Sequence, residues 1–378
     1  AESPALRDRP PLPKRVPATI AINEVLTPGN VPLDAQPLQK RLVAQIHEIV
    51  DGDMPAPAYY LAGRKHPTWL FDSPADLVWA LCEAWPFLPG ALKPKVRAYL
   101  QATMKAHPLW EDKPLCADGG RRREYFPITS ENRETVTAIS RLKEAKLRRL
   151  YALWLYAHRT GDVAYIRKNW PTIASFAAKG LKQIDAYGPT YADLTGLIGL
   201  ARLARLAEQT DLAMSTITDI ARLGKILSDI EAFRSRFDER SRLVIAPNYV
   251  RVKDRPAALG VLLVDLVPAA VRVMDAEALA AHRDAVAAAV PHWFIGIGGP
   301  TYGEDVWAGA VTMPPHVPAG YFQLHAWLGQ SPPEQLARWV DVPCVRVGDC
   351  FHIRKLAAAL MQASKPGYAP LQPPDAND

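Results

Sequence analysis

Apolar residues recur at helical spacing along most of the chain, and the segment 150–173 shows how successive helices are connected. Its first half places apolar or aromatic residues at i, i+3, i+4, i+7 and i+8, which is the spacing of a packed helix. These positions are Leu150, Leu153, Trp154, Ala157 and His158. Gly161 can adopt the left-handed conformation that ends a helix, and Asp162 is a suitable N-cap for the next helix. The segment therefore predicts two antiparallel helices joined by one tight turn.

The second helix of this pair contains an internal proline. Val163, Ile166 and Trp170 restart the helical period, and Pro171 follows directly. Because proline lacks an amide hydrogen and clashes with the preceding turn, we expect Pro171 to kink or break this helix.

The same spacing predicts helices over nearly all of the chain that follows residue 72. We expect them at about residues 73–85, 91–106, 134–159, 162–179, 193–209, 211–235, 256–274, 276–290, 317–329, 332–341 and 352–364. Most are separated by short connections rich in N-cap and helix-breaking residues, so neighbouring helices should run antiparallel as hairpins. One strand-like interval, Arg242 to Val252, predicts a small β-hairpin insertion.

The two ends of the chain have a different composition. Residues 1–60 are proline-rich and predict an extended arm that wraps over the main domain, with one helix at about Gln36 to Val50. Residues from Pro366 onward predict a disordered tail. The expected organisation is therefore an arm over 1–60, a helical domain over 61–365 and a tail over 366–378.

Two segments of the predicted domain look like copies of each other. Gly188 to Gly196 reads GPTYADLTG, and Gly299 to Gly309 reads GPTYGEDVWAG. They begin about 110 residues apart, about twice the length of a 55-residue helical hairpin, and hairpins repeated at this period predict a closed ring or a solenoid. Gly-Pro-Thr is also a common turn composition, so coincidence is the alternative explanation.

The segment Arg149–Trp170, with its Leu-Tyr-Ala-Leu-Trp and Thr-Gly-Asp runs, resembles a helical hairpin of the six-hairpin glycosidase-like (α/α)6 toroids. That superfamily includes glycoside hydrolases and several polysaccharide lyases. Trp69–Leu88 and Pro300–Leu328 are similar in style to other hairpins of such proteins. The resemblance covers about residues 65–365 and lies in hairpin-building residues, without a complete catalytic motif of any one family. It implies an all-α fold, an (α/α)6 toroid whose inner helices converge on a cleft at one end.

The two Gly-Pro-Thr-Tyr loops are the candidates for the rim of that cleft. Each presents a tyrosine followed by carboxylates: Tyr191 with Asp193, and Tyr302 with Glu304 and Asp305. Hydrolysis of a glycosidic bond uses two carboxylates roughly 5–10 Å apart across the sugar, one as acid and the other as base or nucleophile. We therefore expect Asp193 to act with Glu304 or Asp305, and both tyrosines to bind substrate.

These residues also have structural interpretations. Asp193 stands where the helix expected at 193–209 begins and would suit an N-cap, and Glu304 could belong to the first turn of a short helix. Trp307, beside the second loop, could stack on a sugar ring or simply belong to the core.

A second cluster, Gly119–Pro127, contains three consecutive arginines and a tyrosine. Arg123 could bind a uronate carboxylate through a two-pronged hydrogen bond. A lyase removes the proton next to such a carboxylate with Tyr, His or Lys while a cation or amide neutralises the acid. Tyr125 or His325 could supply the base and Asn248 the amide. The alternatives are a solvated basic loop and, for His325 on its largely apolar helix, a hydrogen-bonded core histidine.

Composition and charge restrict the classes of partner that we expect. Hydrophobic residues make up 49% of the chain and charged residues 22%, as in ordinary globular proteins. No run of about 20 apolar residues occurs in the sequence, so we expect no membrane-spanning helix. The net charge of +6 comes from basic residues scattered along amphipathic helices, which argues against a nucleic-acid partner and would suit an acidic polysaccharide.

The sequence gives no support for a metal or cofactor. It contains no His-x-x-x-His, Glu-x-x-His or Cys-x-x-Cys pair, no phosphate-binding loop and no Gly-x-Ser-x-Gly motif. Cys82 could pair with Cys116, and Cys344 with Cys350, in an oxidising compartment, or all four could be thiols in the cytosol. The first residues, Ala-Glu-Ser, are what a signal peptidase could leave, so we expect a secreted or periplasmic protein.

These observations predict a carbohydrate-active enzyme with a glycan substrate, either a glycoside hydrolase or a polysaccharide lyase acting on a uronate. The alternative, from a different class, is a non-catalytic helical binding or scaffold protein of the cell envelope. In that case the rim loops would be structural caps and the arm would mediate assembly.

Overall fold

The computed structural model describes residues 12, 14–52, 59–61, 67–69, 74–111, 146–187, 189–235, 264–289, 316–341 and 350–372. These residues are mostly helical, with two small antiparallel sheets, which confirms the predicted all-α class. None of the described helices is both long and apolar enough to cross a bilayer.

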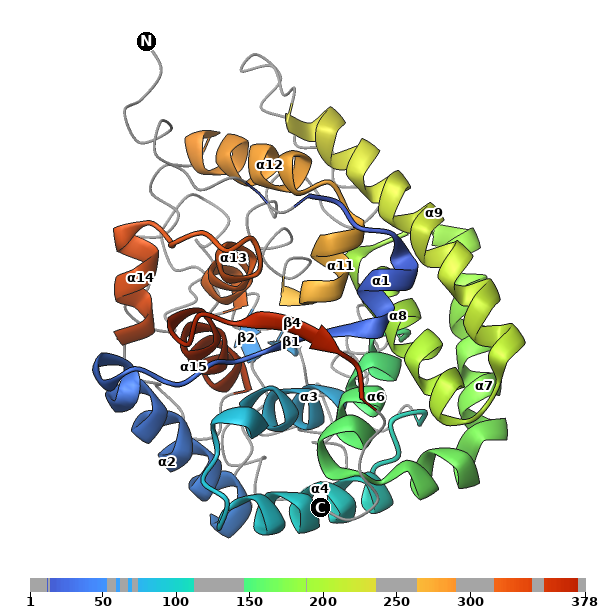
Figure 1. Ribbon diagram of the computed structural model, residues 1–378, viewed down its shortest axis with the longest axis horizontal. Helices are drawn as coiled ribbons and strands as arrows, with labels where there is room; N and C mark the ends of the chain where they lie inside the picture. The colour runs from blue at the N-terminus through green and yellow to red at the C-terminus, as the bar shows by residue number, and fades with distance from the viewer. Residues whose placement is uncertain are drawn as a thin grey trace.

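One set of helices, the inner helices, is buried around most of its circumference. They are α3 (Pro74–Ala84), α6 (Arg148–Thr160), α8 (Tyr191–Leu206), α11 (Pro268–Val273), α13 (His316–Trp327) and α15 (Cys350–Ala363). Nearly every residue of α3, α6 and α8 is buried. A helix that is apolar on all sides must be enclosed on all sides, and Figure 1 shows these helices nearest the centre of the molecule.

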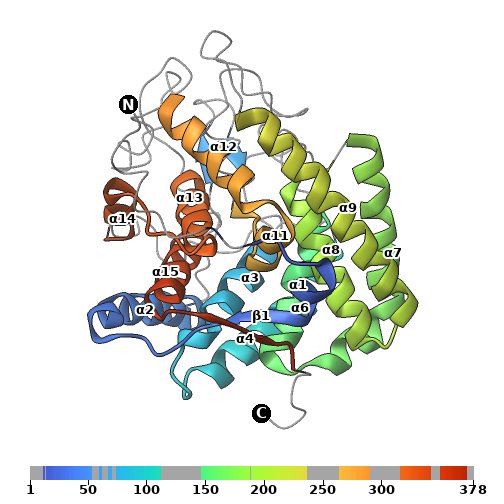
Figure 2. The ribbon, with the colours of Figure 1, turned by 45° about the horizontal axis from the view of Figure 1, so that its top comes forward.

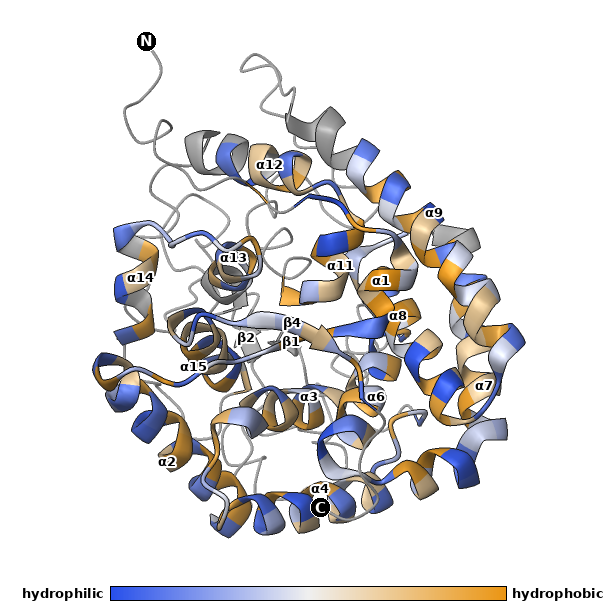
Figure 3. Ribbon diagram, viewed as in Figure 1, coloured by the Kyte–Doolittle hydropathy of each residue, from blue (hydrophilic) through white to orange (hydrophobic). Residues whose placement is uncertain are grey.

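A second set, the outer helices, is amphipathic and buries only one stripe. They are α2 (Gln36–Gly52), α4 (Lys93–Ala106), α7 (Val163–Tyr187), α9 (Thr210–Ser235), α12 (Ala276–Ala289) and α14 (Glu334–Asp341). In α2 the buried residues are Leu42, Ile46 and Ile49, one face of a 3.6-residue period. Figure 1 places these helices at the periphery, and Figure 3 shows hydrophilic and hydrophobic residues interleaved along them.

Outer and inner helices alternate along the described chain from α2 to α15. The inner helices contact one another in the order α13, α15, α3, α6, α8, α11, and outer helices pack on this layer, for example α9 on α8 and α2 on α15. The indole nitrogen of Trp327, at the end of α13, donates to the carbonyl oxygen of Leu266, just before α11 (3.2 Å). The first and last inner helices of this order are therefore also connected.

Two short sheets complete the fold. β1 (Glu24–Thr27) pairs antiparallel with β4 (Gly367–Pro370), with Glu24 opposite Pro370. Figures 1 and 2 show this sheet lying across one end of the inner helices, so segments from both ends of the described chain cover that end. The other sheet is the hairpin of β2 (Tyr59–Leu61) and β3 (Pro67–Trp69). Helix α1 (Ala18–Asn23) and the 3-10 turns Leu33–Ala35 and Trp85–Phe87 are the remaining elements.

Most predicted helices lie close to observed ones, but α7 continues to Tyr187 and α6 begins, in the described chain, only at Arg148. Two further predictions concern proline. The helix expected at 256–274 is interrupted in its described part: Val264 is helical, residues 265–267 are not, and α11 begins at Pro268. The residue before a proline is driven out of the helical region, and Val267 has φ −119° and ψ 159°. Pro171 does not break its helix either, since α7 runs through it from Val163 to Tyr187.

The predicted ends of the domain need correction as well. Gly367–Pro370, expected in a disordered tail, forms β4, because β1 provides a partner strand that lies far away in the sequence. The arm contains α1 and β1 in addition to α2, and α2 packs on α15 and α4 as the other outer helices pack on their neighbours. The β-hairpin expected at 242–252 lies outside the described residues.

Helices α6 and α8 approach closely because two glycines of α8 face α6. A Cβ atom added at Gly196 would overlap the backbone of Leu147, and one added at Gly199 would overlap the backbone of Tyr151. Neither obstacle is the flexible end of a side chain, so a larger residue would force the two helices apart.

We predict that Gly199→Ala destabilises the protein by about 1–3 kcal/mol, because overpacking against backbone cannot be relieved locally. The measurement is the free energy of unfolding in urea. Gly90→Ala is the matched control, since a Cβ at Gly90 meets nothing within 4 Å and should leave stability nearly unchanged. Equal effects of the two substitutions would contradict the close approach.

Candidate functional site

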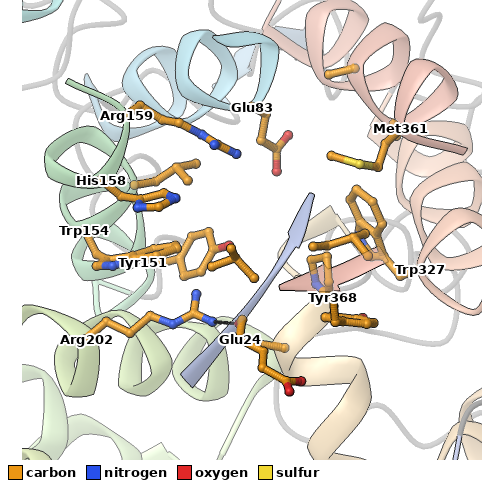
Figure 4. A pocket seen from close by; sticks show the side chains of 17 residues that line it. Glu24, Glu83, Tyr151, Trp154, His158, Arg159, Arg202, Trp327, Met361 and Tyr368 are labelled. Atoms are coloured by element: carbon orange, nitrogen blue, oxygen red, sulfur yellow. Dashed lines mark hydrogen bonds between the residues drawn. The ribbon is translucent and has the colours of Figure 1, made fainter. Parts of the chain in front are cut away.

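A cavity of about 60 Å³ lies among the inner helices, beneath the β1–β4 sheet. Its lining comes from α3, α6, α8, α13 and α15, from the start of α11, and from both strands. Figure 4 shows the charged and aromatic side chains that surround it, most of them directed inward, whereas the carboxylate of Glu24 points away. The principal ones are Glu24, Glu83, Tyr151, Trp154, His158, Arg159, Arg202, Trp327 and Tyr368.

Glu83, on α3, is one of two carboxylates that line the cavity, and it is fully engaged. Its Oε1 accepts a hydrogen bond from the indole nitrogen of Trp79 (2.6 Å), and its Oε2 pairs with Nε of Arg354 (2.8 Å). The guanidinium carbon of Arg354 also lies 4.3 Å from the ring centroid of Trp79. The charge of Glu83 is therefore balanced by Arg354.

Glu24, on β1, is the other lining carboxylate, and it is paired with Arg272. Its Oε2 lies 2.7 Å from Nη1 of Arg272. The Arg272 guanidinium carbon lies 3.8 Å from the ring centroid of Tyr368, and burial raises the pKa of Tyr368 to about 12. Tyr368 is therefore a neutral phenol at physiological pH.

Arg202, on α8, holds the N-terminal segment against the inner helices. Its Nε donates to the carbonyl oxygen of Ile22 (3.1 Å), and its Nη2 donates to those of Ala21 (3.1 Å) and Glu24 (2.7 Å). Its guanidinium carbon lies 4.1 Å from the ring centroid of Trp154. Burial lowers the pKa of Arg202 to about 10, so it stays charged at neutral pH without a carboxylate partner among the described residues.

Arg159, near the end of α6, has no such partners. Its Nε is buried without a hydrogen-bond acceptor, and no described carboxylate lies within ion-pair distance of its guanidinium. Burial lowers the pKa of Arg159, an effect that the nearby Cys82, Tyr151 and Glu83 partly oppose. In Figure 4 the side chain points into the cavity on the side of Glu83.

His158 and Tyr151, both on α6, contribute neutral polar groups. The His158 ring stacks on Trp154, with centroids 5.2 Å apart and planes 11° apart. Burial, together with the charges of Arg159 and Arg202, lowers the pKa of His158 to about 3, and burial raises the pKa of Tyr151. At neutral pH the titratable groups that line the cavity are thus a neutral histidine, neutral tyrosines, two arginines and two carboxylates already paired elsewhere.

Of the residues predicted from the sequence, three lie in the described part of the chain. They are Tyr191, Asp193 and His325, and they are not on the lining of this cavity. The other seven candidates, Arg123, Tyr125, Asn248, Tyr302, Glu304, Asp305 and Trp307, lie outside the described residues, and so does the second Gly-Pro-Thr-Tyr segment.

Asp193 occupies the third position of α8 and takes part in a capping box. Its Oδ2 accepts from the amide (2.9 Å) and the hydroxyl (2.7 Å) of Thr190, while its own amide donates to the Thr190 hydroxyl (3.3 Å). Asp193 is therefore not the N-cap that the sequence suggested: Thr190 is the N-cap, and Asp193 is its capping-box partner inside the first turn. The hydrogen bonds from described residues all converge on Oδ2, which leaves Oδ1 for another group.

A buried charge cluster lies at the same N-terminal ends of the inner helices. Arg148, 3% exposed, pairs with Asp76 through two contacts (Nη1–Oδ1 2.8 Å and Nη2–Oδ2 2.9 Å) and with Oδ1 of Asp265 (3.1 Å). Burial raises the pKa of Asp193, and Asp265 adds to this increase. Arg148 and Arg159 stand at opposite ends of α6, about 16 Å apart along the helix axis, so this cluster is distinct from the cavity.

Tyr191 and His325 are both buried. Tyr191 is the first residue of α8. His325 is 7% exposed on α13, and its Nδ1 lies 3.3 Å from Nη1 of Arg283, which also donates to Oε1 of Gln330 (2.5 Å). This polar network joins α12 to α13, as expected for the core alternative for His325.

Sequence reasoning missed the cavity residues. Trp154 and His158 were counted as part of an apolar stripe, and Arg159, Arg202 and Glu83 were not considered. The available signal was the presence of single arginines within otherwise apolar helices, as in the run LIGLARLARL at 197–206. Among the described residues, no group of three His, Cys, Asp or Glu side chains is arranged to hold a metal ion.

No known protein family matches this chain, and no curated protein or solved structure shows significant similarity to it.

The depressed pKa of His158 makes stability depend on pH. A histidine in an unfolded chain has a pKa near 6.5, so below that pH the unfolded state binds a proton that the folded state does not. Stability should therefore fall as the pH falls from 6.5 toward about 3, with a contribution from His158 of about 1.4 kcal/mol per pH unit. Urea unfolding of His158→Gln across this range should give a curve less steep by that amount. An unchanged slope would show that His158 is protonated in the folded protein.

Proposed function

We propose that the described helices belong to an (α/α)6 toroid and that the protein is a secreted or periplasmic carbohydrate-active enzyme, a glycoside hydrolase. The alternation of outer and inner helices and the order of contacts among the inner helices support the toroid. The β1–β4 sheet covers the end of the inner layer that holds the helix C-termini, which leaves the N-terminal end for a substrate cleft.

The observation that carries the enzymatic proposal is the raised pKa of Asp193, at the N-terminal end of the inner layer. Burial beside Asp265 raises the pKa of Asp193, whereas Asp265 is paired with Arg148. A neighbouring pair of carboxyl groups in unlike environments is the usual arrangement for dividing acid and base roles. Asp193, with Oδ1 not engaged by described residues, would donate the proton to the leaving glycosidic oxygen.

The second carboxylate of the reaction would come from Glu304 or Asp305, as the sequence suggests. Their segment precedes α13 in the sequence, and the N-terminus of α13 belongs to the inner layer. The segments with Arg123, Tyr125 and Asn248 likewise precede α6 and α11 in the sequence. Tyr302 and Trp307 would bind the glycan, and a positive net charge suits an acidic one.

The first experiment identifies the reaction. We expect incubation with a panel of neutral and uronate-containing polysaccharides to release reducing ends without ultraviolet absorbance from an unsaturated sugar. Absorbance appearing together with the reducing ends would identify a lyase and remove the acid role from Asp193. No product from any glycan in the panel would favour the non-catalytic binding alternative.

The second experiment separates catalysis from helix capping. Asp193→Asn should lower the turnover of the responsive glycan by about 10²–10⁴-fold, the usual contribution of a general acid. Thr190→Ala is the matched control, because it removes the same capping box while keeping the Asp193 carboxyl group. Each substitution should cost about 1 kcal/mol of stability. Equal activity of the two variants would show that Asp193 serves only as a cap.

A further inference from the structure

The lining of the β1–β4 cavity carries more positive charge than its neighbours neutralise. Glu83 is balanced by Arg354, and Glu24 by Arg272. Arg202 is satisfied by three carbonyl oxygens, which accept its hydrogen bonds without cancelling its charge. Arg159 has neither a hydrogen bond nor an ion pair within the described part of the chain. Two guanidinium charges are therefore left without an anion.

Burying a charge without a counter-charge costs several kcal/mol, and the usual remedy is a paired ion. Arginine cannot avoid this cost by losing its proton, since its pKa stays far above neutral even when lowered. The surroundings also favour an anion, because Tyr151 is a neutral phenol that can donate a hydrogen bond and Trp154 supports Arg202 from the side.

The two arginines that lack a counter-charge line the same cavity. In Figure 4 the guanidinium group of Arg159, from α6, lies beside Glu83 and that of Arg202, from α8, lies beside Glu24, with His158 and Tyr151 between them. The cavity of about 60 Å³ has room for several water-sized groups. A carboxylate of three or four heavy atoms therefore fits it.

We propose that this cavity binds one small carboxylate anion at Arg159, in the positive field to which Arg202 adds. The Arg159 guanidinium can match the planar carboxylate with parallel N–H···O bonds, whereas the Nε and Nη2 hydrogens of Arg202 are already donated to carbonyl oxygens. The site is independent of the proposed hydrolase activity, because it lies at the opposite end of α6 from Asp193 and its neighbours.

Thermal unfolding in the presence of acetate tests the site. In a zwitterionic buffer we expect acetate to raise the Tm of the wild-type protein in proportion to the logarithm of its concentration, by about 3 °C for a hundredfold increase above Kd. Glucuronate, which carries the same carboxylate on a sugar ring, should have no such effect. An equal effect of glucuronate would show that the occupant is a uronate and that the cavity opens to admit it, which would overturn the proposal.

Arg159→Met is the decisive variant, and Arg167→Met is its matched control on the exposed surface of α7. Arg159→Met should have a higher Tm than wild type in buffer without acetate, because it removes a half-buried charge that has no ion-pair partner among the described residues, and its Tm should not respond to acetate. Arg167→Met should respond as wild type does. Equal responses of wild type and Arg159→Met would overturn the proposal.

Saturation-transfer NMR of the wild-type protein with formate tests binding without any variant, in case Arg159→Met fails to fold. We expect transfer to formate, and competition by acetate should reduce it. No transfer would overturn the proposal, and it would leave the assignment of Asp193 untouched.

Discussion

The structure depends on one constraint, the enclosure of helices that are buried on nearly every side. Nearly all residues of α3, α6 and α8 are buried, so each of these helices needs neighbours on every side. Inner helices contact one another laterally, and amphipathic helices such as α9 cover their outward sides. The C-terminal end of this layer is then closed by β1 and β4, two strands from distant parts of the sequence. Burial of the hydrophobic surface of these helices thus accounts for both the two helix layers and the terminal sheet.

The inner layer also contains charged side chains, and these charges are stabilised in two different ways. At the N-terminal ends of the helices, Arg148 meets Asp76 and Asp265, and the charges are paired directly. At the C-terminal ends, Arg202 instead uses carbonyl oxygens and an aromatic face, and Arg159 is left with an unsatisfied nitrogen. The N-terminal end of the inner layer therefore gathers carboxylates, whereas the C-terminal end gathers arginines without a counter-charge. This difference is why we assign acid chemistry to the first end and anion binding to the second.

Local patterns in the sequence were enough to find most helices, because a 3.6-residue period and its caps are read within a dozen residues. The turn at Gly161 is an example, with φ 74° where the left-handed conformation was expected. Features that depend on distant partners were not accessible: β4 needs β1, and its own residues, Gly-Tyr-Ala-Pro, carry no strand pattern. Arg159 could not be recognised as a lining residue either, because arginine is usually exposed and a single arginine within an apolar helix does not show which space its side chain faces. For the candidate site, Asp193 was correctly located at a helix start, but its place beside Asp265 required the fold.

The β1–β4 pairing also has a consequence for how the chain folds. Strand β1 precedes every inner helix, whereas β4 follows the last of the described helices. During synthesis β1 therefore stays unpaired until the helices and β4 have left the ribosome. Its edge is exposed during that time. Contacts of such long sequence separation form slowly, and an unpaired strand edge is a site for aggregation. Chaperones that shield this strand would then act late, when β1 pairs with β4, and not during helix formation.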